Sequence, residues 1–273
     1  MSVPAAFSSL SPAESRTAAL AELRLLLSRE PSWSESLQQT TVCFGVGPLD
    51  DRLPNGGLAS ALHEIVPATH TALPAAFGFI VAALARCLSS EAANKKKIIF
   101  VMPGYEARQC GRLSGRLSGH GLNGLGFDPS RAILVEPAHR PDTLWALMEA
   151  LRSQAPQAAV GMIDRLDLKT SQKLHLAASD CGVPLLLLRP AQTLESSAAA
   201  TRWRIGAAPA ARDRFGAYAR PRWHLQLERC RNGRPGEWVV EYDHVAHRFS
   251  LVAALADQTL SRGTGDQSRR QAG

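Results

Sequence analysis

Five short, mostly apolar segments recur along the first two thirds of the chain, and amphipathic stretches of helical length separate them. The apolar runs cover residues 62–66, 97–102, 132–135, 158–163 and 184–188. The intervening stretches at 74–90, 105–119, 141–153 and 170–181 have helical periodicity. Unbroken Val/Ile/Leu runs are typical of strands buried on both faces of a parallel sheet. The pattern therefore predicts an α/β fold with a mostly parallel sheet flanked by helices.

The pattern changes after residue 200, where polar and apolar residues alternate. "TRWRIG", "RWHLQLERCR" and "EWVVEYD" are typical of antiparallel strands with one solvent-exposed face. Asn232-Gly233 between the last two favours a hairpin turn. We therefore expect antiparallel strands toward the C-terminus.

The two ends of the chain differ from its centre. Residues 12–30 predict an amphipathic helix that Pro31 ends, with a stripe formed by Leu20, Leu23, Leu26 and Leu27. A polar stretch follows as a linker. Residues 257–273 contain too few apolar side chains to fold, and we expect a disordered tail.

The composition of the 273 residues, 45% hydrophobic and 20% charged, is that of a globular protein. The five cysteines never occur as C-x-x-C, which argues against a disulfide framework or a zinc ribbon. The N-terminus has no signal-peptide pattern. The longest uncharged apolar run, residues 72–85, is too short to span a bilayer. We expect a cytoplasmic protein with no membrane contact.

The net charge of +7 is concentrated in one segment. Between residues 201 and 235 there are nine arginines but only two acidic residues, which suggests an acidic partner, either nucleic acid or a protein surface. Trp203, Phe215, Tyr218 or Trp223 of the same segment could stack on bases. The alternative is that these arginines form the wet face of antiparallel strands, with the tryptophans in the core. The candidate DNA- or partner-binding residues are Arg202, Trp203, Arg204, Arg212, Arg214, Arg229, Arg231 and Arg234.

Specific motifs indicate a family. "FGVGPLDDRLPNGGLASALHEIVP" resembles the segment that leads into the phosphate loop of RecA-type recombinases. The combination of "LHEI", "GVPLLLLR", "TRWRI" and "RCRNGRPGEWVVE" resembles the ImuA family, recombinase-related accessory proteins of DNA-damage-induced translesion mutagenesis. The small-residue stretch "RPAQTLESSAAA" before residue 201 lies where recombinases have a mobile DNA-contacting loop.

The resemblance implies a RecA-like, P-loop-type core over residues 41–256, preceded by the helix and linker of residues 1–40 and followed by the tail. It also implies partners: a Y-family polymerase-like protein of the ImuB type and an error-prone replicative-type polymerase. RecA and single-stranded DNA are further candidates.

The expected phosphate loop departs from the nucleotide-binding pattern G-x-x-x-x-G-K-[ST]. Pro67 and Ala72 occupy the glycine positions, with Ala68 following Pro67. Leu73 takes the place of the lysine, and Pro74 that of the hydroxyl residue that binds magnesium. Proline also removes a backbone donor. We therefore predict a degenerate nucleotide site.

Asp164, after the strand at 158–163, occupies the position of a Walker B carboxylate. Without a phosphate loop we interpret it as a strand-end acid. "GHGLNG" matches G-x-G-x-x-G but precedes a strand, so we expect a loop and no cofactor. His244 and His247 have no third ligand in view, and we expect no metal.

These patterns together predict a non-catalytic, RecA-like adaptor in damage-induced translesion synthesis, with no catalytic residue and no cofactor. The alternatives are a single-stranded-DNA-binding protein and an atypical ATPase of the recombinase class.

Overall fold

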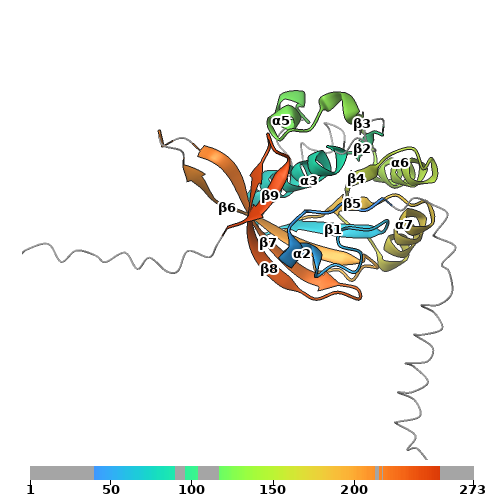
Figure 1. Cartoon of the computed structure of the whole chain (residues 1–273). Coiled ribbons are helices and arrows are strands. Elements are labelled where there is room, and N and C mark those ends of the chain that lie inside the picture. Colours follow the sequence, from blue (N-terminus) through green and yellow to red (C-terminus); the bar gives the residue numbers. More distant parts are fainter. Residues whose placement is uncertain (1–39, 90–95, 104–116, 213–214, 217, 253–273) are drawn as a thin grey trace, which may run out of the picture.

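A computed structural model describes residues 40–89, 96–103, 117–212, 215–216 and 218–252. The predicted helix 12–30, most of the predicted helix 105–119 and the predicted tail 257–273 lie outside these residues. One nine-stranded sheet runs through the described part, in the order β3-β2-β4-β5-β1-β6-β7-β8-β9 (Figure 1).

The first six strands of this order pair in parallel, and the last three pair antiparallel. The parallel strands are β3 (Ala132–Val135), β2 (Ile98–Val101), β4 (Ala158–Met162), β5 (Leu185–Leu188), β1 (Leu62–Pro67) and β6 (Thr201–Arg212). The antiparallel strands are β7 (Tyr218–Cys230), β8 (Gly236–Asp243) and β9 (Arg248–Leu251). The predicted α/β class and the antiparallel C-terminal strands are confirmed.

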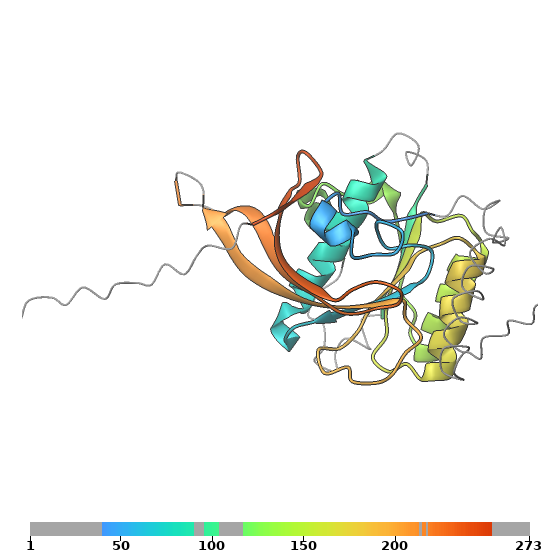
Figure 2. The same cartoon turned by 60° about the horizontal axis from the view of Figure 1, so that its bottom comes forward.

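Helices cover both faces of the sheet. On one face lies the core helix α3 (Leu73–Leu88), and the antiparallel strands curve toward its side (Figure 2). On the other face lie α6 (Arg140–Arg152) and α7 (Leu168–Asp180). The remaining helices are short: α2 (Gly47–Asp50), α5 (Gly119–Gly124), and the 3-10 turns η2 (His70–Ala72) and η4 (Pro129–Arg131).

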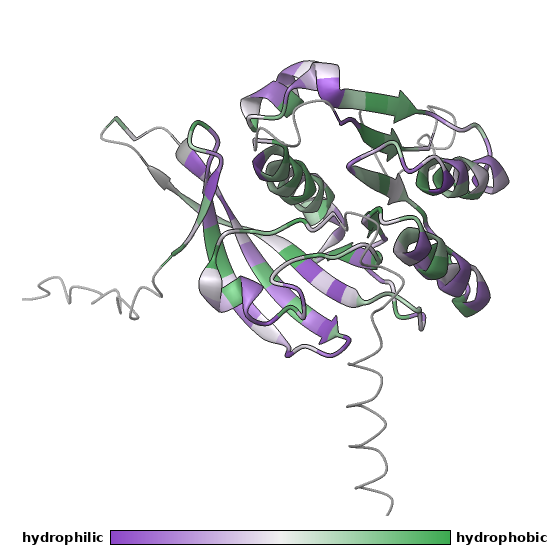
Figure 3. Cartoon of the chain, turned by 45° about the vertical axis from the view of Figure 1, so that its right-hand side comes forward, coloured by the Kyte–Doolittle hydropathy of each residue, from purple (hydrophilic) through white to green (hydrophobic). Residues whose placement is uncertain are grey.

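Each face has its own apolar core. Figure 3 shows hydrophobic residues along α3 and the parallel strands, and hydrophilic residues on the outer sides of α6 and α7. The stretch His70–Leu88 is long and apolar enough to cross a membrane by length and composition. In this fold that stretch is a packed core helix, because side chains such as Phe79 and Ile80 are fully buried.

One local prediction is wrong. The "GHGLNG" segment, expected to be a loop, forms the helix α5. Ser118 precedes this helix, and its side chain accepts a hydrogen bond from the Gly121 amide, which satisfies one of the free donors at the helix start. The predicted β7–β8 hairpin is present, and Asn232 adopts a positive φ of 60° in its turn.

A buried histidine links the central strand to its neighbour. His63 Nδ1 lies 2.9 Å from the Thr201 hydroxyl, and His63 Nε2 lies 2.9 Å from the Ala59 carbonyl oxygen. Because a carbonyl only accepts, Nε2 carries the proton, and Nδ1 accepts from Thr201. Burial lowers the pKa of His63 to about 4.

This histidine predicts a loss of stability in mild acid. Between about pH 6.5 and pH 4 the unfolded chain binds a proton that folded His63 does not, so the free energy of unfolding falls as the pH falls. The full effect is roughly 3 kcal/mol. Urea denaturation at pH 7 and pH 5 should show a smaller loss for His63→Gln than for the wild type. Equal losses would contradict the assignment.

Candidate functional site

Residues 67–74 connect the central strand β1 to the core helix α3, the place of the phosphate loop in P-loop proteins (Figure 1). Pro67 ends β1 and is buried, whereas Ala68 and Pro74 are exposed. Leu73, which replaces the lysine, begins α3 and packs half-buried against the core. Its side chain offers no charge to a phosphate.

The backbone of this loop bonds to the protein itself. The Ala68 amide donates to the Ile205 carbonyl of β6 at 2.7 Å, and the Ala72 amide donates to the Thr69 carbonyl at 3.1 Å. Pro74 has no amide hydrogen. All of residues 67–74 are described, and none has a positive φ. A phosphate loop needs free amides arranged around an anion, and this loop directs two of them into internal bonds.

Asp164 is exposed at the carboxyl edge of the sheet, two residues after β4. It lines a hollow of about 110 Å³ together with His139 and Arg140, at the start of α6. Strand β5 lies between β4 and β1, so Asp164 is not on the strand next to the loop at 67–74.

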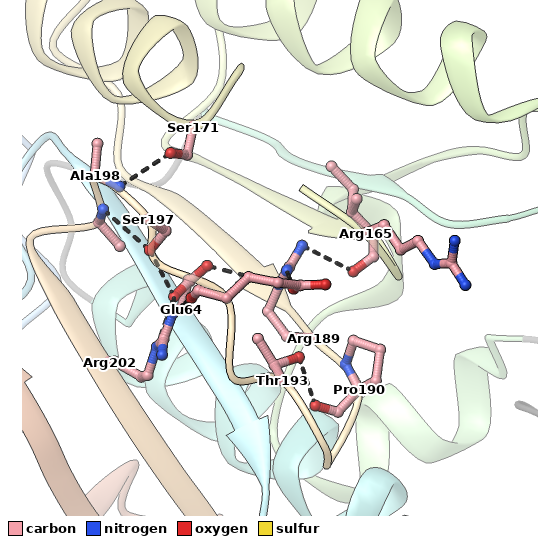
Figure 4. A network of polar contacts seen from close by, with 12 residues as sticks. Glu64, Arg165, Ser171, Arg189, Pro190, Thr193, Ser197, Ala198 and Arg202 are labelled. Carbon is pink, nitrogen blue, oxygen red and sulfur yellow. Dashed lines mark hydrogen bonds and ion pairs between the residues drawn. The ribbon is translucent and has the colours of Figure 1, made fainter. Parts of the chain in front are cut away.

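The most strongly buried polar group of this region is one that the sequence analysis did not select. Glu64 lies in the middle of β1 with its side chain fully buried (Figure 4). Arg202 Nη2 approaches Glu64 Oε2 at 2.7 Å, and Arg189 Nε approaches Glu64 Oε1 at 3.6 Å. Ser197 Oγ donates to Oε2 at 2.9 Å. The carboxylate therefore joins strands β1 and β6 and the end of β5.

The same arginines hold the segment between β5 and β6. Arg189 Nη2 contacts the Glu195 carboxylate, and Arg202 Nη2 donates to the Glu195 carbonyl, each at 2.7 Å. The Ala198 amide donates to Ser171 Oγ of α7 at 3.0 Å. Where recombinases have a mobile DNA-contacting loop, this chain has a segment fixed by side-chain bonds at both ends.

Because this network is buried, each charged side chain in it depends on its partners for neutralisation. Desolvation lowers the pKa of Arg189, and the carboxylates of Glu64 and Glu195 oppose that shift. Taking the charge from one partner of a buried pair leaves the other uncompensated. The sequence does contain a signal for the network, since a single Glu interrupts the apolar strand "LHEIVP" and an Arg ends "PLLLLR".

Most of the arginine side chains that the structure describes between residues 201 and 235 pair with acidic residues. Arg204 pairs with Glu228, one of the two acidic residues within residues 201–235. Arg229 Nη2 donates to the Ser197 and Ala199 carbonyls, each at 3.0 Å. The further pairs are Arg220–Glu241, Arg220–Asp243, Arg222–Glu241 and His224–Glu237.

These contacts correct part of the predicted binding surface. Trp203 is fully buried and donates from Nε1 to Thr201 Oγ1, so the prediction that it stacks on bases is wrong. Arg202, Arg204 and Arg229 are not free surface cations, because internal acceptors bind them. The alternative interpretation is right about the tryptophans, because Trp203 and Trp223 are buried in the core. It does not describe Arg202, which binds the buried carboxylate of Glu64.

The remaining candidates lie at the two ends of these strands. Arg212 ends β6, but its side chain is not described, and Arg214 lies outside the described residues. Arg231 and Arg234 are exposed in the β7–β8 turn.

Arg52 lies beside that turn, because the Arg234 amide donates to the Arg52 carbonyl at 3.2 Å. Arg52 and Arg234 line an open hollow of about 600 Å³. No ion pair joins Arg52, Arg231 or Arg234 to any described residue. We call these three residues the arginine corner.

His244 and His247 lie in the turn between β8 and β9. The Tyr242 hydroxyl lies 3.3 Å from His247 Nδ1. Within the described part of the chain, no three His, Cys, Asp or Glu side chains gather in a metal-binding arrangement.

Comparisons with known proteins show the family of this chain. Two curated relatives named Protein ImuA, from two strains of Caulobacter vibrioides, are each 34% identical over 238 residues, which is 80% of this chain and 91% of the relative. The chain is also similar to the crystal structure of a KaiC-like protein from Pyrococcus horikoshii OT3. That match has a TM-score of 0.48 and 13% identity, over 78% of this chain and 99% of that one. No family model matches the chain.

The sheet and its helices define an α/β protein of the RecA-like class, in which Leu73 and Pro74 occupy the loop positions where the nucleotide-binding pattern has a lysine and a hydroxyl residue. The similarity to the Caulobacter proteins covers most of this chain and most of theirs. The chain belongs to the ImuA family.

The buried network gives a stability prediction. Glu64→Gln should lower the free energy of unfolding by about 3 kcal/mol, because it leaves the Arg189 guanidinium buried without its central counter-charge. The control Glu149→Gln removes an exposed pair with Arg152 and should cost less than about 1 kcal/mol. Urea denaturation of both variants measures the difference, and similar losses would show that the network is not important for stability.

Proposed function

We propose that this protein is a non-catalytic adaptor in DNA-damage-induced translesion synthesis and acts in the cytoplasm. Membership of the ImuA family supports the broader role, a RecA-like accessory protein of damage-induced mutagenesis. The observation that carries the non-catalytic part is the loop at 67–74, which has the position of a phosphate loop without its chemistry.

A triphosphate and its magnesium require charged and polar contacts from the loop that binds them. A lysine and a hydroxyl each supply contacts worth roughly 1.5–3 kcal/mol when one partner is charged. Leu73 and Pro74 supply neither, and the amides of Ala68 and Ala72 are already bonded. Binding Mg·ATP here would require breaking internal bonds without gaining charged ones.

The adaptor role requires a surface for partners. The proposed partners are a Y-family polymerase-like protein of the ImuB type, an error-prone replicative-type polymerase, and RecA. Among the candidates, the arginine corner is exposed and lacks described counter-charges, which suits an acidic partner surface. We assign the contact with the polymerase-like protein to the antiparallel strands of residues 201–250 together with the C-terminal tail.

A substitution at the Walker B position distinguishes the adaptor proposal from the alternative of an atypical ATPase. Asp164→Asn removes the carboxylate that a nucleotide-hydrolysing relative would need, at an exposed position. The mutation frequency of a deletion strain after DNA damage should be restored fully by this variant. A frequency as low as that of the empty vector, at equal protein level, would favour the atypical ATPase.

Single-stranded DNA binding is a second candidate, and the arginine corner is the observation that favours it. If these side chains bind phosphates, Arg231→Ala with Arg234→Ala should reduce the slope of log K against log salt by about 1.4, since each phosphate contact on a single strand contributes about 0.7. The control variant, Arg220→Ala with Arg222→Ala, removes arginines that are paired internally and should leave the slope unchanged.

The same two variants test the adaptor. Loss of co-purification with the polymerase-like protein in the Arg231/Arg234 variant, with no change in DNA binding, supports the protein contact. Loss of DNA affinity alone supports the second candidate. Unchanged behaviour in both assays would remove the arginine corner from either function.

A further inference from the structure

Strands β6 and β7 continue as a two-stranded ribbon beyond the rest of the sheet. β1 pairs with only the first five residues of β6, and β8 pairs with β7 only from Arg222 onward. The pairing of β6 with β7 continues outward as far as Arg212 and Tyr218. Figures 1 and 2 both show this part projecting from the body of the molecule. Residues 206–212 and 218–221 are here called the projecting ribbon.

Ion pairs with the end of β8 brace the base of this ribbon. Arg220 Nη2 lies 2.8 Å from Asp243 Oδ2. Arg222 Nη2 lies 2.6 Å from Glu241 Oε2. A two-stranded hairpin alone is marginally stable in water, so these contacts help to hold the ribbon in its direction.

The turn at the outer end of the ribbon presents an aromatic ring. Phe215 lies midway between Arg212 and Tyr218, in the connection that joins the two strands. Its side chain is 79% exposed. Gly216 beside it has a φ of 79°, which glycine adopts without strain. The fold therefore places a large apolar ring in water at its most extended point.

Phe215 differs from the other aromatic residues of the arginine-rich segment. Trp203 and Trp223 are buried in the core, and the side chain of Tyr218 is not described. Trp203 and Trp223 cannot reach a ligand without unfolding the sheet. The exposed ring of Phe215 is open to a partner that binds an aromatic face.

The ribbon offers little surface to a folded protein. Apart from Arg220, its described side chains are small: Gly206, Ala207, Ala208, Pro209, Ala210 and Pro221. A stable protein interface buries about 800 Å² on each partner and depends on several large anchoring side chains. Pairing with a strand of a partner is also disfavoured, because Pro209 and Pro221 remove a backbone donor from each strand.

An unpaired base needs much less surface. Each base has a flat π-face that stacks on a single aromatic ring, and in a single strand that face is open without unstacking a duplex. The phosphates on either side of the base favour a nearby cation, and Arg214 directly precedes Phe215 in the sequence. The shape of the ribbon and the chemistry of its tip thus suit single-stranded DNA better than a protein.

We propose that the Phe215 ring stacks on an unpaired base of single-stranded DNA and that the projecting ribbon carries the ring to the strand. The inference rests on the second candidate function, single-stranded DNA binding, and adds a contact distinct from the arginine corner. Arg231 and Arg234 follow the opposite end of β7, a strand about 40 Å long. The two contacts would therefore bind separate parts of one DNA strand.

The affinity of the full chain for a fluorescein-labelled oligothymidylate, measured by fluorescence anisotropy, tests the stacking contact. Phe215→Leu should weaken binding about tenfold, because it keeps an apolar side chain and removes the aromatic face. Phe215→Trp should bind as tightly as the wild type. The matched control is Val245→Ala, which shortens another apolar side chain, 80% exposed in the β8–β9 turn, and should leave the affinity unchanged.

The salt dependence of the same affinities separates stacking from a charge contact. Phe215→Leu should leave the slope of log K against log salt unchanged, since it removes no phosphate contact. The double substitution Arg231→Ala with Arg234→Ala is expected to reduce that slope. Thermal melting of each variant checks that the sheet remains folded.

Equal affinities of the wild type and Phe215→Leu would overturn this inference and leave DNA binding by the arginine corner in place. A wild type that does not bind the oligonucleotide would overturn both. Loss of co-purification with the polymerase-like protein in Phe215→Leu, at unchanged DNA affinity, would also overturn it, because the ring would then contact a protein. The expected result is a loss in Phe215→Leu alone, at a constant salt slope.

Discussion

The buried carboxylate of Glu64 is the interaction on which the centre of this fold depends. It lies on β1 with no exposure to water and is neutralised by arginines at the end of β5 and on β6. A charge in that position is tolerated only when partners satisfy it. The requirement fixes Arg189 and Arg202, and through them it fixes the segment that connects β5 to β6.

The loop after the central strand is bonded to the protein's own backbone. In P-loop proteins, a nucleotide and its metal bring charge to the loop after the first strand. Here the charges at the centre of the sheet all come from the protein, and the loop at 67–74 bonds to β6 through Ala68 and Ile205. These bonds support the proposed adaptor role, in which partners bind the surface of the RecA-like frame.

The strands of the parallel half could be predicted closely, because each is a mostly apolar run and a stretch of helical length separates it from the next run along the chain. The predicted strand at 132–135 and the predicted helix at 141–153 agree with β3 and α6 within one residue. The candidate site was harder to predict from composition. The count of acids within residues 201–235 suggested unpaired arginines, but Arg202 pairs with Glu64, which lies 138 positions earlier. Trp203 was misplaced for a related reason. The alternation of polar and apolar residues predicts that a strand has two different faces, but it does not show which of them packs on the core.

Calorimetric titration of the purified full chain with Mg·ATP measures whether this RecA-like frame holds a nucleotide. No saturable heat is expected up to millimolar Mg·ATP, because the loop offers neither a lysine nor a hydroxyl at positions 73 and 74. Binding of one Mg·ATP per chain with a micromolar dissociation constant would contradict it.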